Sequence, residues 1–178
     1  MGGRLSLFKE RWQSCDGFVR KLINHGLVWK FAASPSRSNR VSKQQDSPEL
    51  DEILKSYIMK NAIERSKIKP SLISTVKTVP KSSGGFRLVV DLRKLNDSIK
   101  KVNISLPTIA NLRVALRKGY WMGKLDIMDA FFHVEVNPAF RKYLGFRWGN
   151  QYWRFRAMPF GLTTAPAVFT SKLSFGVI

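Results

Sequence analysis

Apolar residues recur along this chain with two different periods, and each period predicts a different kind of element. From residue 48 to about residue 66 they fall at helical spacing, which predicts an amphipathic helix with one apolar face (Leu50, Ile53, Leu54, Tyr57 and Ile58). From residue 72 the period changes to two, because "LISTVKTV" and "FRLVVDL" are alternating, β-branched runs separated by the turn residues "PKSSGG". These runs predict a β-hairpin with Lys81 in its turn and Arg87 just inside the returning strand.

Several shorter signals complete the pattern after residue 103. We expect a short helix after a proline-marked turn at 107, a short buried strand in "WMGKLDI" that ends at Asp126, and a helix capped by Asn137 with Pro138 in its first turn. "LGFRWGNQYWRFRAM" predicts a second hairpin around Gly149 and Asn150, and a Pro/Gly loop leads into a helix from about Ala165. Hairpins mixed with helices of modest length predict an α+β fold.

The first 47 residues differ from the rest. Residues 4–31 carry several large apolar side chains, with Gly26 closing a helix, whereas residues 32–47 are polar. The helix at 48 is expected to start with a capping box of Asp46 and Glu49, with Pro48 in the first turn. We therefore divide the chain into a helical arm with a polar linker (1–47) and a main region (48–178).

Composition excludes several classes of protein. With 44% hydrophobic and 12% aromatic residues, the chain has enough apolar side chains to bury a core. It has no apolar run long enough to cross a membrane and no secretory signal sequence, which favours an intracellular location. Its one cysteine, Cys15, can neither staple the fold nor build a zinc site.

The balance of charge points to a polyanionic partner. Lys and Arg number 31 against 12 acidic residues, which gives a net charge of +19, and no acidic residue follows Glu135. Nucleic acid is the simplest partner for such an excess. A membrane surface is the rival, but the basic residues are not confined to one amphipathic helix, and a merely solvated basic surface is the plain alternative.

Two aspartates stand among apolar residues in "KLDIMDAFFHV", residues 124–134. Asp126 could cap the next helix, hold a turn or bind a metal, and Asp129 could be an acidic residue in a first helical turn. Magnesium is usually held by one or two carboxylates together with substrate phosphates. A carboxylate beside a basic surface therefore indicates chemistry on phosphates.

Four ordered blocks resemble the reverse transcriptase domain of retroelements. They are "VPKSSGGFRLVVDLRKLN", "LPT", "GYWMGKLDIMDAFFHVEVNPAFRKYLGF" and "YWRFRAMPFGLTTAPAVF". The resemblance covers about residues 75–173 and is nearest to the gypsy-like and DIRS-group retrotransposons; "GRLSLFKERW" and "GFVRKLINHGLVWKF" also resemble the segment before the polymerase in the DIRS group. It implies the fingers and part of the palm of a right-hand polymerase fold, with an incomplete palm sheet.

The resemblance implies roles for the central block. Asp126 matches the first catalytic carboxylate, which binds Mg²⁺, and the carbonyl of Ile127 would be a further metal ligand. Asp129 and Ala130 match a turn whose backbone amides meet the nucleoside triphosphate. Phe131 matches an aromatic gate that disfavours a 2′-hydroxyl; its alternative is core packing, which Phe132 is better placed to do.

The flanking blocks imply further contacts. Arg87 matches a fingers arginine on the triphosphate and Lys81 a lysine at the fingers tip, while Arg93 matches a residue near the template strand. Phe160 and Gly161 belong to a loop under the nucleotide; retroviral enzymes usually have Gln at the position of Phe160. The implied partners are an RNA or DNA template-primer and a dNTP, and the oligomeric state stays open.

One family motif is missing. No two aspartates are adjacent anywhere in the chain, although the family has such a pair after the "PFGL" block. We interpret the chain as an N-terminal fragment of a reverse transcriptase and expect no polymerase activity from it alone. The alternatives are a non-catalytic, basic nucleic-acid-binding remnant and a degenerate product that barely folds.

Overall fold

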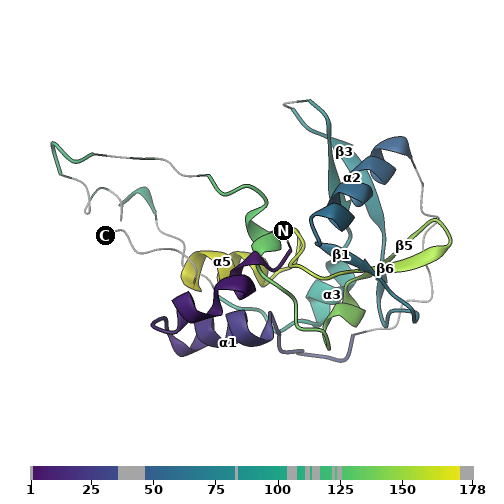
Figure 1. Ribbon diagram of the computed structural model, residues 1–178, viewed down its shortest axis with the longest axis horizontal. Coiled ribbons are helices and arrows are strands. Elements are labelled where there is room, and N and C mark those ends of the chain that lie inside the picture. Colours follow the sequence, from purple (N-terminus) through teal and green to yellow (C-terminus); the bar gives the residue numbers. More distant parts are fainter. Residues whose placement is uncertain are drawn as a thin grey trace.

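A computed structural model describes residues 2–35, 47–82, 84–103, 108–110, 113, 117–121, 123 and 126–172. Helices come first along the chain, and two groups of strands follow with short helices between them (Figure 1). The elements are η1 (Arg4–Trp12), α1 (Gly17–His25), α2 (Pro48–Met59), β1 (Ile63–Arg65), β2 (Ile73–Ser74), β3 (Val76–Pro80), β4 (Phe86–Val90), α3 (Arg93–Ser98), η2 (Ala130–His133), η3 (Arg141–Tyr143), β5 (Gly145–Trp148), β6 (Gln151–Phe155) and α5 (Ala165–Lys172). The predicted α+β class is confirmed.

The larger of the two described sheets is mixed and has the strand order β1-β6-β5-β2. Strands β5 and β6 are an antiparallel hairpin that turns at Gly149, as the sequence predicts, and β2 adds to β5 in parallel. A Cβ at Gly145, where β5 begins, would lie 2.3 Å from the side chain of Pro70. Only glycine therefore lets the chain before β2 pass this close to β5.

The second sheet is the predicted hairpin of β3 and β4. Its antiparallel register pairs Val76 with Val90 and Pro80 with Phe86, and Figure 1 shows it extending beyond α2. Gly84 and Gly85 both have a positive φ in the turn, where the Lys81 amide donates to the carbonyl of Gly85. The start of the predicted run, Ile73–Ser74, instead forms β2 in the first sheet.

Helix α2 begins one residue later than the expected capping box. Ser47 is the N-cap and its hydroxyl accepts from the Leu50 amide, while Pro48 stands in the first turn. Asp46 lies outside the described residues. The helix ends at Met59 rather than near residue 66, because Asn61 takes a left-handed conformation (φ 58°) and the chain turns into β1.

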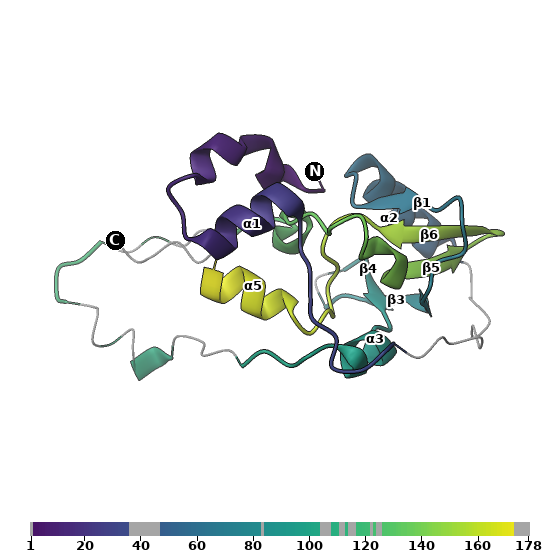
Figure 2. The same ribbon diagram turned by 90° about the horizontal axis from the view of Figure 1, so that it is seen from below.

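Residues of the N-terminal arm share the hydrophobic core with later segments. Leu27 pairs with Val136 in a parallel bridge, Phe31 pairs with Ile99, and the Trp29 ring meets that of Phe140 at 4.8 Å. Helix α1 lies beside α5 in both views (Figure 2). The arm therefore packs both against the chain at the end of α3 and against the region that follows residue 130.

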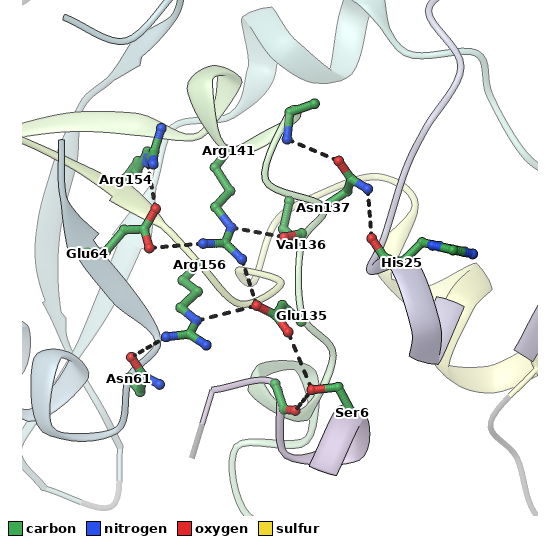
Figure 3. A network of polar contacts seen from close by, with 12 residues as sticks. Ser6, His25, Asn61, Glu64, Glu135, Val136, Asn137, Arg141, Arg154 and Arg156 are labelled. Carbon is green, nitrogen blue, oxygen red and sulfur yellow. Dashed lines mark hydrogen bonds and ion pairs between the residues drawn. The ribbon is translucent and has the colours of Figure 1, made fainter. Parts of the chain in front are cut away.

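The buried guanidinium of Arg141 joins strand β1 of the mixed sheet to residues 135 and 136 (Figure 3). Arg141 donates to Glu64 at 2.9 Å, to Glu135 at 2.6 Å and to the carbonyl of Val136 at 3.0 Å. Glu64 also accepts from Arg154 at 2.7 Å, and Arg156 lies 3.4 Å from Glu135. We call these five side chains the Arg141 network; the buried charge is tolerated because it is paired and hydrogen-bonded.

The strand predicted in "WMGKLDI" falls partly outside the described residues, because residues 122, 124 and 125 are not among them. The described positions 121, 123, 126 and 127 are not in a strand, and the side chain of Trp121 is fully exposed. The helix predicted after Asn137 is wrong. Asn137 begins a turn rather than an α-helix: its side chain accepts from the Ala139 amide, and the 3₁₀ helix η3 follows.

The sequence also predicts a helix after residue 107 and another from about Ala165. The predicted helix after residue 107 falls largely outside the described residues, of which 109, 110 and 113 are helical. The helix predicted from about Ala165 is confirmed as α5. Within the described part of the chain, no helix is long and apolar enough to cross a membrane.

Candidate functional site

Residues 126–129, which include the two aspartates, lead through a turn at 128 and 129 into the short helix η2. Asp129 has a left-handed backbone (φ 51°), and its carbonyl accepts from the Phe132 amide at 2.8 Å. The ring nitrogen Nε2 of His133 lies 3.1 Å from the carbonyl of Met128. Asp126 is exposed rather than enclosed in apolar packing, so its carboxylate is available to a ligand.

Asp129 is held by a lysine from a distant element. The Lys60 ammonium, just after α2, donates to its carboxylate at 2.6 Å, and the two side chains are 39% and 31% exposed. Nearby, the ring of Tyr57 packs against Phe132 at 4.8 Å. Burial, and then the negative charge of Asp129, raise the pKa of Tyr57 to about 12.

A first cavity of about 500 Å³ lies between α2, the β3–β4 hairpin and the loop after β6; we call it the fingers cavity. It is lined by five residues that the sequence selected separately: Lys81, Arg87, Asp129, Phe160 and Gly161. Apolar side chains of α2 and β4 complete its wall. The cavity thus combines cations, one carboxylate and an aromatic ring, which suits an anionic ligand with a flat apolar part.

A second cavity of about 430 Å³ contains Asp126 and Ile127; we call it the Asp126 cavity. Its other lining residues are Arg4, Lys60, Met128, Asp129, Phe132 and His133. Lys60 and Asp129 line both cavities, so this ion pair stands between Asp126 and the basic hairpin. The structure therefore places Asp126 next to the predicted triphosphate contacts.

Phe132 packs in the core, as the sequence suggests, whereas the gate role of Phe131 stays a prediction. Phe132 is 2% exposed in the core, whereas Phe131 is half-buried and packs on Phe160 at 4.8 Å and on Phe169 at 5.7 Å between ring centroids. Neither Ala130 nor Phe131 lines the two cavities. Phe131 instead supports Phe160, which does line the fingers cavity.

The loop that carries Phe160 and Gly161 is fastened to α3 by a residue that sequence reasoning missed. The Asn96 side chain donates to the carbonyl of Gly161 at 2.8 Å and accepts from the Thr163 amide at 2.9 Å. Gly161 has φ 87°, a conformation that favours glycine. The one available signal was the position of Asn96 at the end of the "VVDLRKLN" block.

Arg93 lies away from the two cavities, in a neighbouring groove. Its guanidinium, 85% exposed, donates twice to Asp91, at 2.9 and 2.7 Å. These hydrogen bonds lower the pKa of Asp91 to about 2. Arg93 lines a third cavity of about 500 Å³ with Asp91 and Asn96, and Gly161 lines both this cavity and the fingers cavity.

The oxygen ligands near Asp126 fit part of a magnesium site. The Asp126 carboxylate and the Ile127 carbonyl are hard ligands of the kind that Mg²⁺ prefers. The carboxylate of Asp129 is already engaged by Lys60, and no cluster of three His, Cys, Asp or Glu residues occurs in the described part of the chain. These residues supply one carboxylate and would need further oxygens from a substrate or another segment.

Comparison with known proteins gives sequence relatives among transposons. The chain is 27% identical over 139 residues to the retrovirus-related Pol polyprotein from transposon 412 of Drosophila melanogaster, which covers 78% of this chain and 11% of the relative. It is 34% identical over 94 residues to the transposon Tf2-3 polyprotein of Schizosaccharomyces pombe, which covers 53% of this chain and 7% of the relative. The chain thus spans only a small part of these polyproteins.

Solved structures show the same fold. The prototype foamy virus protease–reverse transcriptase matches with a TM-score of 0.63 at 19% identity, over 84% of this chain and 21% of that one. The fold is thus similar to part of a right-hand polymerase. The family model described as "Reverse transcriptase (RNA-dependent DNA polymerase)" matches residues 79–174, more than half of the chain. The protein therefore belongs to the reverse transcriptase family.

Proposed function

We propose that this chain contributes the fingers and the first part of the palm to a retroelement reverse transcriptase, and that the fingers cavity binds the triphosphate of an incoming dNTP. The supporting observation is that Lys81, Arg87, Asp129, Phe160 and Gly161, which come from three separate sequence blocks, line one cavity. Residues 48–178 form the polymerase region in this proposal, and residues 1–47 form the arm. The gypsy-like or DIRS group is the proposed subgroup.

Each proposed contact has a physical basis. Lys81 and Arg87 are exposed on the β3–β4 hairpin and supply positive charge, with Arg87 able to make a bidentate phosphate contact. The turn at Asp129 and Ala130 offers backbone amides. The ring of Phe131, which packs on Phe160 behind the cavity wall, would set the room left for the sugar, and Arg93 would lie near the template strand.

Asp126 and the carbonyl of Ile127 would hold Mg²⁺. When bound, the ion would activate the attacking 3′-hydroxyl and neutralise charge on the transferred phosphoryl group. The chain's own residues position the triphosphate beside Asp126, because the two cavities share Lys60 and Asp129. Since the sequence contains no adjacent aspartate pair, we expect no primer extension by this chain alone on a primed RNA or DNA template with magnesium.

A binding assay tests the nucleotide site. A fluorescent dNTP with Mg²⁺ should bind saturably to the full chain, and Arg87→Gln should weaken it about tenfold through loss of a charge-assisted contact. Arg65→Gln is the matched control, since Arg65 is also an exposed strand arginine but lines none of the three cavities described above. Absence of saturable binding, or equal affinity for both variants, would contradict the proposal.

The net charge of +19 favours one other function, a non-catalytic nucleic-acid-binding module. Such a module would bind single- and double-stranded nucleic acid with a steep dependence on salt. It would not bind a free dNTP at the fingers cavity. Titration of labelled oligonucleotides at several salt concentrations, with and without dNTP as competitor, separates the two functions.

A further inference from the structure

Lys60 was not selected by any sequence motif, yet it stands at the junction of the two cavities. It immediately follows helix α2, and its ammonium donates to Asp129 at 2.6 Å across 69 residues of sequence. Both side chains line the fingers cavity and the Asp126 cavity. A cation at this junction faces both the proposed triphosphate contacts and the proposed metal ligand.

The backbone on both sides of this ion pair is fixed by the N-terminal segment. The Gly2 amide donates to the carbonyl of Lys60, and the Gly3 amide donates to the carbonyl of Phe132 at 2.8 Å. Phe132 in turn donates to the carbonyl of Asp129. A Cβ at Gly2 would lie 2.1 Å from the carbonyl oxygen of Asn61, so this close approach requires glycine. Lys60 and Asp129 are therefore held in place even though their side chains are partly exposed.

The charges around the fingers cavity do not balance without a ligand. Among the described residues, its lining has three cations, Lys60, Lys81 and Arg87, against the one carboxylate of Asp129, which gives these side chains a net charge of +2. A magnesium-bound triphosphate is still anionic and complements this excess. An ammonium has three N–H donors, so a lysine can contact a carboxylate and a phosphate oxygen together.

We propose that Lys60 is a third triphosphate-binding cation, held in position by its ion pair with Asp129. The proposal rests on the proposed function of the fingers cavity. Lys60 contacts the triphosphate from the Asp126 side, opposite the two cations of the β3–β4 hairpin. Asp129 is then a positioning residue that keeps the ammonium at the junction when no nucleotide is bound.

Three variants of the full chain test this role, with a fluorescent dNTP and Mg²⁺ at one fixed salt concentration. Lys60→Gln should weaken binding about tenfold, and Lys60→Arg, which keeps the charge, should retain most of the affinity. Lys55→Gln is the matched control: Lys55 is an exposed lysine of helix α2, which Lys60 follows, and it lines neither cavity. Equal affinity of Lys60→Gln and Lys55→Gln would overturn the proposal.

The double variant Lys60→Gln/Asp129→Asn separates direct contact from simple charge masking. If Lys60 touches the triphosphate, the double variant should bind as weakly as Lys60→Gln alone. If Lys60 only neutralises Asp129, removing both charges should restore wild-type affinity, and the proposal is then wrong. Arg87→Gln shows whether the role of Lys60 or the whole nucleotide site is wrong. If Arg87→Gln weakens dNTP binding and Lys60→Gln does not, only the role of Lys60 is overturned. If the wild-type chain binds no dNTP, the proposed function is overturned as well.

Discussion

The Arg141 network and the Lys60–Asp129 pair join segments that are about equally far apart in sequence, 77 residues for Arg141 and Glu64 and 69 for Lys60 and Asp129. Their surroundings differ. The Arg141 side chain is 9% exposed and its guanidinium contacts two carboxylates, whereas Lys60 and Asp129 are 39% and 31% exposed. Water competes for the second pair but hardly reaches the first. The first is therefore suited to holding the fold, and the second to meeting a ligand.

The largest expected effect comes from breaking the buried cluster. Arg141→Ala should lower the free energy of unfolding by about 3 kcal/mol, because the partly buried carboxylates of Glu64 and Glu135 both lose an ion-pair partner whose own side chain is buried. Arg147→Ala is the control; its guanidinium is exposed and contacts Asn150 and Gly149 in the β5–β6 turn. Chemical denaturation measures both. Similar losses for the two variants would contradict the assignment of Arg141 as a structural cation.

A smaller change tests whether the cluster acts as a unit. Glu64→Gln removes the charge that contacts both Arg141 and Arg154 but keeps a hydrogen-bonding side chain. We expect a loss of about 1–2 kcal/mol in the free energy of unfolding. In the double variant Glu64→Gln/Arg154→Gln the losses should be less than additive, since one contact is counted in both single variants. Strictly additive losses would show that Glu64 and Arg154 do not stabilise the fold through their contact with each other.

The exposed pair of Asp91 and Arg93 offers a comparison by pH. The folded-state pKa of Asp91 is lowered to about 2. The ion pair therefore contributes fully to the free energy of unfolding above the ordinary carboxyl pKa near 4, and this contribution disappears as pH falls towards 2. Because solvent screens the pair, the contribution is below about 1 kcal/mol. An NMR titration of the Asp91 carboxyl should show the low pKa, and Arg93→Gln should return it towards 4. An unshifted wild-type pKa would contradict the ion pair.

The smallest expected effect on stability belongs to Lys60. Lys60→Gln should change the free energy of unfolding by less than about 1 kcal/mol, because both partners of this pair are partly exposed. Denaturation of this variant next to Arg141→Ala measures the contrast directly. A loss as large as that of Arg141→Ala would place both ion pairs in the same structural class, and the nucleotide-binding data for Lys60 would then need the charge-conserving variant Lys60→Arg.

Local patterns were sufficient for both hairpins. Alternating β-branched or aromatic residues around Gly-rich turns specify a strand pair within about 15 residues of chain, so no distant partner is needed. The helix expected after Asn137 was wrong, because an Asn followed by proline also fits a turn: the Asn137 side chain accepts from the Ala139 amide, and the 3₁₀ helix η3 follows. The strand expected before Asp126 lies partly outside the described residues and stays a prediction.

The residues of the candidate site also fall into those that the local sequence identifies and those that only the structure reveals. Lys81, Arg87, Phe160 and Gly161 stand in blocks that can be recognised from sequence, and one cavity contains them all. Lys60 carries no motif, since a lysine at the end of a helix is common and its partner Asp129 is distant in sequence. Arg141 resembles any other member of the basic C-terminal third until the structure places it between two carboxylates.

The packing of the N-terminal arm has a practical consequence for recombinant expression. The bridges from Leu27 to Val136 and from Phe31 to Ile99 are backbone contacts, and Val19, Leu22 and Ile23 bury their side chains in the common core. A shortened protein starting at residue 48 would uncover that apolar surface and leave the carbonyls of Lys60 and Phe132 without the amides of Gly2 and Gly3. Soluble, assayable protein is therefore best sought from the full 178 residues.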